Sequence, residues 1–468
     1  MKNEIEKYMV IITFISSYFT VFVMSGVILC TPSIAKEFGM NNIVQNWILT
    51  AFTLVVTMLT IPAGQIAGKY GFKRTLYLSN SIFLIGLIGT LCAHTTEVFF
   101  ITRLIQSVGI AFVNVCEIAI ISLAISKESR GKALGIIITA VYLGHSTSPV
   151  ISGFLNYNFG WRSIFIISII FIAISVILVK QKITPEWKTN ENDKIDKIGS
   201  LLYMAGIGFF IYGFTTLITI EGKILTILGI IILAIYILYE LKQKTPAFDV
   251  NLFKTKSFTA YNISGMFGYF SVMVFSTLIN YYFQYVKGFN SEMTGLILII
   301  SPVVMSITAP YAGKLSDKIH PQKIATVGMV VMTSSLLILS CLNKNTPMYI
   351  IVIAMILQAF GTGLFSSPNL NAIMSSVDEK YAGFASAGQL ATRAIGQSMS
   401  LGLLTLIFSW IMGNLNLSTI YANMILKASD ITFIICAIVC GFAILTSIIG
   451  IKSDNKLKKY DFIDFYIK

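Results

Sequence analysis

Charge is scarce in this 468-residue sequence: Asp, Glu, Lys and Arg make up 12% of it, about half the share found in ordinary soluble domains. Hydrophobic residues make up 55%, and the mean hydropathy is +0.79. These values exclude a soluble globular protein. Apolar runs of about 18 residues or more recur along the whole chain, and each is long enough to cross a bilayer as a helix. The composition predicts a polytopic helical membrane protein.

Cysteine and histidine are also scarce, with six and three residues. They form no CxxC pair and no Cys/His cluster with metal-ligand spacing, so we expect neither a metal site nor a disulfide framework. The ATP-binding pattern GxxxxGK[ST] is absent, which argues against an ATP-driven pump. No catalytic constellation is present either. We therefore expect no enzyme activity and no cofactor.

No stretch of the sequence fits a soluble domain, which a membrane sensor that does not transport would need. The chain instead predicts an all-α fold of fourteen transmembrane helices joined by short loops. The first of them is too long for the core of a cleaved signal peptide, so we expect it to be retained. The predicted spans are residues 8–31, 45–66, 75–93, 98–125, 133–156, 162–180, 198–219, 223–240, 258–285, 292–312, 324–342, 347–367, 384–411 and 430–450.

The net charge of +13 follows the predicted topology. If the amino terminus lies in the cytoplasm, most Lys and Arg residues outside the spans fall on the cytoplasmic side, and this asymmetry orients membrane proteins. The charge therefore predicts a multi-pass protein of the cell membrane with both termini cytoplasmic. It does not indicate a nucleic-acid partner.

The fourth predicted span carries polar residues along one face. At about 100° per residue, Gln106, Asn114 and Glu117 fall within roughly 60° of Arg103 on a helix. Arg103 and Glu117 are separated by about 21 Å of helix rise, so they form no direct ion pair. A charge that faces lipid is costly, so this face predicts a wet cavity or polar partners on other helices. Glu117 is the only acidic residue that we place inside a span, and it is our candidate proton carrier.

Two loops repeat one another at matching places in the chain. GQIAGKYGFKR (Gly64–Arg74) and GKLSDKIHPQK (Gly313–Lys323) each follow the second span of a six-span half. Repeats of this kind build transporters from two halves that rock against each other. We expect a first half at 1–180, a linker and inserted helix pair at 181–256, a second half at 257–451 and a cytoplasmic tail at 452–468.

With these loops the chain resembles the major facilitator superfamily, and within it the fourteen-span drug:proton antiporter family of multidrug, quaternary-ammonium and tetracycline exporters. The resemblance covers essentially the whole chain. It implies that an acid in the loop caps a neighbouring helix end while basic groups hold the cytoplasmic face closed, although topology alone also accounts for basic residues there. Gly68 stands at the acidic position of the first copy. The loop residues assigned in this way are Gly64, Lys69, Gly71, Lys73, Arg74, Gly313, Asp317 and Lys318.

The fourth and fifth spans resemble two further family motifs. Arg103, Gln106 and Gly109 follow the proton-linked motif, which implies that Arg103 lies in a central cavity and biases the proton affinity of a nearby acid. An arginine that only binds backbone carbonyls is the alternative. The fifth span follows the antiporter motif, whose small residues imply a tight, bendable seam between the halves or, alternatively, a simple packing ridge. The motif residues are Gly135, Gly144, Ser148, Pro149, Ser152 and Gly153.

Three more positions bear on the proton path and the cargo. His145 lies near mid-membrane, where it could titrate or only donate a hydrogen bond. Arg393 in the thirteenth span is a second candidate for a buried charge, or it snorkels to the interface. Val23 stands nine residues before Pro32, where several exporters of the family carry an aspartate that suits cationic substrates. Its absence argues against quaternary-ammonium export.

We predict a secondary antiporter that exports a hydrophobic compound in exchange for protons by alternating access, as in multidrug efflux and antibiotic resistance. The alternative is a carrier of one metabolite, siderophore or peptide, since a fold does not fix a substrate; a membrane sensor is less favoured. The expected partners are a small hydrophobic or cationic drug, protons and the lipid bilayer, and we expect a monomer.

Overall fold

The computed structural model describes residues 2–125, 127–188, 195–243, 246–316, 318–377 and 382–467. Within these ranges the chain is almost entirely helical and contains no β-strand. The first half comprises α1 (Lys2–Glu37), α2 (Asn42–Tyr70), α3 (Phe72–Leu91), α4 (Thr96–Ala124), α5 (Lys127–Phe159) and α6 (Arg162–Lys182). The inserted pair is α7 (Lys197–Thr215) and α8 (Ile220–Glu240).

The second half repeats this plan with more irregular elements. It comprises η1 (Val250–Lys254), α9 (Lys256–Tyr281), η2 (Tyr282–Val286), α10 (Ser291–Leu298), α11 (Ile300–Ser316), α12 (Pro321–Leu339), α13 (Met348–Ser375), α14 (Ala382–Met412), η4 (Thr419–Tyr421) and α15 (Ala422–Ile467).

The described part of the chain contains thirteen helical segments that are long and apolar enough to cross a membrane. They correspond to thirteen of the fourteen predicted spans. The remaining one, the fifth, corresponds to α5, a helix of 33 residues whose described part is rich in Gly, Ser, Thr and Asn. The predicted all-α fold is confirmed, with a helix at each of the fourteen positions.

One predicted span has the wrong bounds, and another is interrupted by a turn. The tenth is not one helix, because α10 and α11 are separated at Ile299; Pro302 has no N–H to offer the carbonyl of Leu298. The last span starts earlier than predicted, because the apolar run before residue 430 is helical as well. Its candidate span, Thr419–Asp454, takes in Asp430, so Glu117 is not the only carboxyl group within a span.

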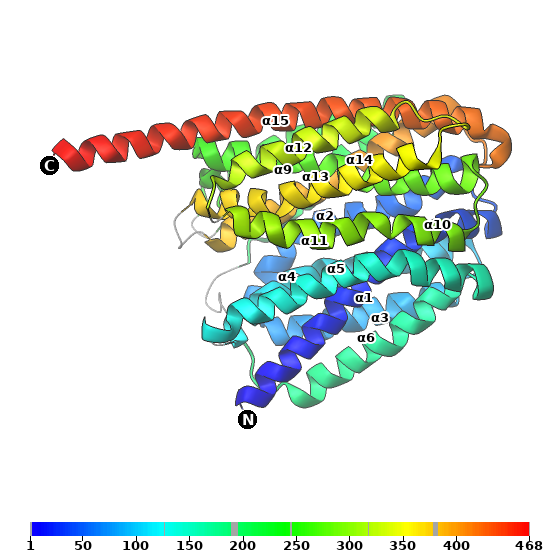
Figure 1. The fold of residues 1–468 in the computed structure, drawn as a ribbon. Coiled ribbons are helices and arrows are strands. Elements are labelled where there is room, and N and C mark those ends of the chain that lie inside the picture. The colour runs from blue at the N-terminus through cyan, green and yellow to red at the C-terminus, as the bar shows by residue number, and fades with distance from the viewer. Residues whose placement is uncertain are drawn as a thin grey trace.

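Each half contains an apolar core, and the core of the first half also takes in Met273 of α9 and Leu401 of α14. Phe22, Phe83 and Phe165 lie at the centre of the first half, and Phe365 and Phe408 lie in the second. Figure 1 shows the first half, blue to teal, lying against the green-to-red second half. The inserted pair packs beside both halves, because α7 contacts α2 and α14.

Both chain ends lie at the same end of the bundle (Figure 1), which we call the near end; the opposite end is the far end. Hydrogen bonds that join the two halves cluster between the middle of the bundle and the far end. The pairs are Asn42–Gly413, Gln45–Tyr285, Tyr281–Asn46, Asn280–Ile28 and Thr57–Ser398, with distances of 2.6–2.9 Å. The halves are therefore tied together at the far end.

Candidate functional site

Glu117 lies on α4 where this helix meets α1, and it is 5% exposed. The Ser17 hydroxyl on α1 donates a hydrogen bond of 2.5 Å to Glu117 Oε2. The other carboxyl oxygen, Oε1, is buried and has no hydrogen-bond partner among the described residues. No cation pairs with this carboxyl group in the same part of the chain. Burial of a charge with a single donor is costly, so a bound proton would relieve it.

Arg103 lies in a separate polar network near the far end of α4. It is 2% exposed, its Nη1 donates to Gln106 Oε1 at 2.6 Å, and its guanidinium carbon lies 4.3 Å from the centre of the Phe52 ring. Gln106 Nε2 in turn donates to Gly86 O and Thr90 Oγ1 of α3, at 3.1 and 2.6 Å. The structure brings Arg103 and Gln106 together but leaves Glu117 apart from them.

The second half repeats the sequence of this segment without the arginine and, within the described residues, without the hydrogen bonds. The segment LIQSVG (Leu104–Gly109) on α4 returns as ILQAFG (Ile356–Gly361) on α13. In both copies the glycine touches the preceding helix, since a Cβ would lie 2.7 Å from Phe83 N or from Gly328 O. The sequence analysis did not identify this second repeat, although a Gln and a Gly recur at the same spacing in the fourth helix of each half.

The same register assigns counterparts to the candidate residues. Met355 corresponds to Arg103, Gln358 to Gln106 and Asn369 to Glu117. Both amide atoms of Gln358 and of Asn369 are buried and lack partners among the described residues. The charged members of the pairs are therefore confined to the first half, and the second half has the apolar Met355 opposite Arg103 and the neutral polar Asn369 opposite Glu117.

The remaining polar candidates lie closer to the boundary between the halves. Asn114 on α4 has an exposed side chain. His145 on α5 is half-buried, and its Nδ1 is 2.9 Å from the Ser25 hydroxyl of α1. Neither side chain contacts Glu117 within the described part of the chain. The predicted proton-path residues thus do not form one connected hydrogen-bond network within the described part of the chain.

The small residues of the α5 motif pack mainly against α1. A Cβ on Gly144 would lie 2.8 Å from Tyr18 O, and Ser148 Oγ donates to Phe22 O at 2.7 Å. Ser152 lies against Gly26 of the same helix. Gly135 lies on α5, but its surroundings fall outside the described residues. This face therefore holds the first half together.

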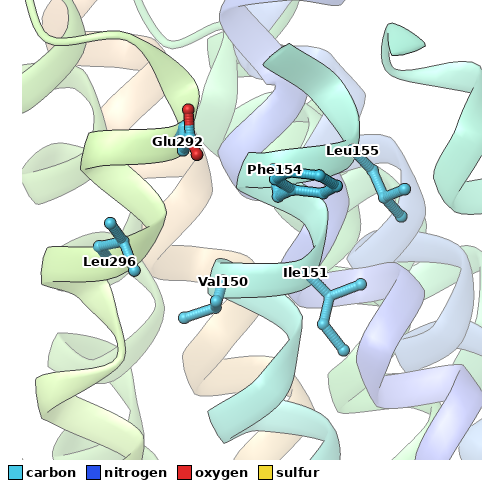
Figure 2. A pocket seen from close by; sticks show the side chains of 6 residues that line it. All are labelled: Val150, Ile151, Phe154, Leu155, Glu292 and Leu296. Carbon is cyan, nitrogen blue, oxygen red and sulfur yellow. The ribbon is translucent and has the colours of Figure 1, made fainter. Parts of the chain in front are cut away.

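The contact with the second half comes from two other motif residues. A Cβ on Gly295 of α10 would lie 2.1 Å from Pro149 O, and one on Gly153 would lie 2.6 Å from Ser291 O. Beside this helix crossing lies a pocket of about 310 Å³ between α5 and α10. Figure 2 shows its mainly apolar lining, with Glu292 as the one charged side chain among Val150, Ile151, Phe154, Leu155 and Leu296.

The loop between α2 and α3 receives its acid from elsewhere in the chain. Gly64 and Lys69 lie on α2, and Gly71 turns the chain with a φ of +108°. The backbone N–H groups of Lys73 and Arg74, at the start of α3, donate to the Glu186 carboxylate at 2.8 and 3.1 Å. Glu186 thus places a carboxylate at the start of α3. In the second copy Gly313 lies on α11 and Lys318 follows it, whereas Asp317 lies outside the described residues.

Arg393, the second predicted buried charge, lies on α14 over an aromatic ring. Its guanidinium carbon is 4.8 Å from the centre of the Tyr269 ring on α9. Tyr269 is 6% exposed, whereas Arg393 is half-buried. The described residues contain no group of three or more His, Cys, Asp or Glu side chains that could hold a metal ion.

Known proteins resemble the chain in both sequence and fold. "Riboflavin transporter RibZ" of Clostridioides difficile is 29% identical over 435 residues, which are 92% of this chain and 94% of the relative. "Multidrug resistance protein Stp" of Mycobacterium tuberculosis is 25% identical over 82% of this chain and 72% of its own. A crystal structure of the peptide transporter POT in complex with sulfate superposes with a TM-score of 0.72 at 14% identity, covering 97% of this chain and 98% of that one.

The match to a family extends over most of the sequence. The description Major Facilitator Superfamily fits residues 10–401 and 261–459. The family consists of transporters rather than enzymes, and the two repeated halves, the helices and the paired loops described above agree with it. The chain belongs to the Major Facilitator Superfamily.

Proposed function

We propose that this secondary transporter is a proton-coupled antiporter that exports hydrophobic compounds by alternating access. The observation that carries the proposal is Glu117, a buried carboxyl group with one hydroxyl donor and no paired cation in the described part of the chain. Uptake of a proton removes a buried charge between α1 and α4, and its release restores that charge. The proton can therefore bias which packing of the two helices is stable.

The arrangement of the halves supports alternating access. Lys and Arg outside the spans favour a cytoplasmic near end, so in this conformation the halves are tied together on the outer side. The tie consists of side-chain hydrogen bonds and the crossing of Gly153 and Pro149 with Gly295. Such contacts can break as a unit when the halves rock, which is how this class of repeat protein exposes its site to the other side.

A carrier of a riboflavin-like metabolite is the second candidate. The relative described as a riboflavin transporter aligns with nearly the full length of both chains. In addition, Val23, buried in α1, stands where a cation-exporting relative would carry an acid. Both observations favour an uncharged or anionic cargo over a quaternary ammonium compound.

Export of Nile red, an uncharged hydrophobic dye, tests the first proposal in everted membrane vesicles, where an exporter moves the dye into the vesicle. We expect efflux that a proton uncoupler abolishes in the wild type, and loss of this uncoupler-sensitive part in Glu117→Gln. Glu97→Gln, which changes an exposed acid in the first turn of α4, is the matched control and should retain it. Uncoupler-sensitive efflux that survives in Glu117→Gln would exclude Glu117 as the proton carrier.

Riboflavin exchange in the same vesicles separates the two candidates. Wild-type vesicles that move neither Nile red nor a panel of other drugs, but do exchange labelled riboflavin, would favour the metabolite carrier. Drug efflux without riboflavin exchange would favour the exporter.

A further inference from the structure

Arg393 is a cation in the interior of the bundle that the proton path does not use. Its helix, α14, packs against α2, α7, α9 and α15, so the helix is surrounded by protein on several sides. Arg393 is nevertheless only half-buried. Part of its side chain therefore stays accessible on a helix that is packed on several sides.

The guanidinium group is held against a ring that is itself fixed. Tyr269 receives the guanidinium at 4.8 Å on its face. Behind it, the ring of the fully buried Phe365 meets the Tyr269 ring edge-on at 5.0 Å. Gly268 makes room for Phe365, because a Cβ there would lie 2.5 Å from the ring. The cation and the aromatic plane are therefore positioned in advance, which reduces the entropy lost on binding.

The first half supplies the opposite side of this cluster. Tyr142 of α5 lies beside Ser366 of α13, the residue next to Phe365, and His145 follows Tyr142 one turn later on the same face of α5. Tyr142 and His145 are both half-buried, and the Ser25 hydroxyl holds the His145 ring at 2.9 Å. Arg393 thus lies where the two halves face each other.

No acid neutralises this charge within the described residues: Arg393 has no ion pair there, and its one strong contact is the Tyr269 ring. An arginine in a partly desolvated interior favours a ligand anion, which its planar fork binds through two parallel hydrogen bonds. The surrounding tyrosine and imidazole rings favour a flat aromatic partner.

We propose that Arg393, Tyr269, Tyr142 and His145 form a binding subsite for a planar aromatic compound that carries a negative charge. This inference rests on the proposed transport function and specifies its cargo. The ring system lies among the three aromatic side chains, and its anionic group binds the guanidinium of Arg393. Because both halves contribute, the subsite is complete only when Tyr142 and His145 face Arg393.

Two dyes with the same three-ring frame and opposite charge test the subsite: fluorescein, an anion at neutral pH, and rhodamine 123, a cation. Binding is measured by fluorescence polarisation on the full-length protein in detergent, with no proton gradient. We expect the wild type to bind fluorescein more tightly than rhodamine 123 by about tenfold or more. Equal affinities, or a preference for rhodamine 123, would overturn the proposal without any variant.

Single substitutions then test whether Arg393 causes the preference for fluorescein over rhodamine 123. Arg393→Gln should remove it, and Arg393→Lys should retain part of it, because the charge stays while the planar fork is lost. Arg162→Gln removes one positive charge at the far end of the bundle, where Arg162 pairs with Glu37, and should keep the full preference. A preference that survives in a folded Arg393→Gln protein would contradict the assignment. Because no gradient is present, failure of proton coupling in the vesicle assay leaves this result unaffected.

Discussion

Gly153 of α5 and Gly295 of α10 approach one another so closely that a Cβ atom on either would lie 3.3 Å from the Cα of the other. They belong to different halves, and the crossing lies toward the far end, beside the hydrogen bonds that tie the halves together. Close approach of this kind requires small residues on both helices. The crossing is therefore a point at which one added side chain acts on the arrangement of the halves.

Gly295→Leu should force the far ends of the halves apart. The new side chain would meet Pro149 O, the backbone atom that already lies 2.1 Å from an added Cβ. Two exposed cysteines, Cys92 after α3 and Cys341 after α12, mark the far end of each half, whereas the other four are buried. Spin labels on this natural pair report the separation by pulsed electron resonance, and we expect the distance distribution to move to longer values.

Gly441→Leu is the matched control for this experiment. Gly441 lies on α15 with open space around it, since nothing lies within 4 Å of an added Cβ. Its distance distribution should equal that of the wild type. An unchanged distribution in Gly295→Leu would show that the crossing does not set the far-end closure.

Ser17→Ala should slow proton-driven efflux without abolishing it. The substitution removes the one hydrogen bond found on the Glu117 carboxyl group, at 2.5 Å, but leaves the carboxyl group in place. Loss of one such bond corresponds to roughly a two- to tenfold change in rate. Ser16→Ala is the control, because the neighbouring hydroxyl binds Ser175 on α6 instead. Equal rates for Ser17→Ala and wild type would separate Ser17 from the proton step.

The number and order of the helices follow from the sequence, because apolar runs of membrane-spanning length need no tertiary information. The break at Ile299 was missed because a proline three residues later reads equally well as a bend. The helix in front of Asp430 was missed because Lys427 and Asp430 interrupt its hydropathy. Local composition therefore predicts the presence of a helix more reliably than it predicts the residues at which the helix begins and ends.

The site was predictable only where one helix carries it. The face of α4 that bears Arg103 and Glu117 follows from helical periodicity, and Arg103 binds Gln106 one turn away. Partners on other helices, such as Ser17 for Glu117 and Tyr269 for Arg393, leave no mark in local sequence. They come together through packing between distant segments.

Gln106→Leu should lower the free energy of unfolding, whereas Gln358→Leu should not, although the two glutamines occupy equivalent positions of the repeat. Gln106 binds Arg103, Gly86 and Thr90, so its loss leaves a buried guanidinium with fewer partners and should destabilise by about 1–3 kcal/mol. Both amide atoms of Gln358 lack partners among the described residues, so leucine should be neutral or stabilising there. Thermal unfolding in detergent measures both. A strong destabilisation by Gln358→Leu would reveal a partner for that amide, such as a bound water.

Glu186→Ala should destabilise the near end of the first half. Its carboxylate caps the first turn of α3 through the N–H groups of Lys73 and Arg74, and loss of such a cap costs about 1 kcal/mol. Gly71→Ala should act at the same place, because φ is +108° there and a Cβ would lie 2.4 Å from the Glu186 carboxyl carbon.

The two substitutions should therefore not be additive. Once Gly71→Ala has displaced the Glu186 side chain, removal of that side chain has little left to break, so the double variant should unfold at a temperature well above the additive expectation. Glu97→Ala, an exposed acid in the first turn of α4, supplies the control for loss of a surface charge. Additive shifts in unfolding temperature would mean that the Glu186 cap and the Gly71 turn stabilise the protein independently.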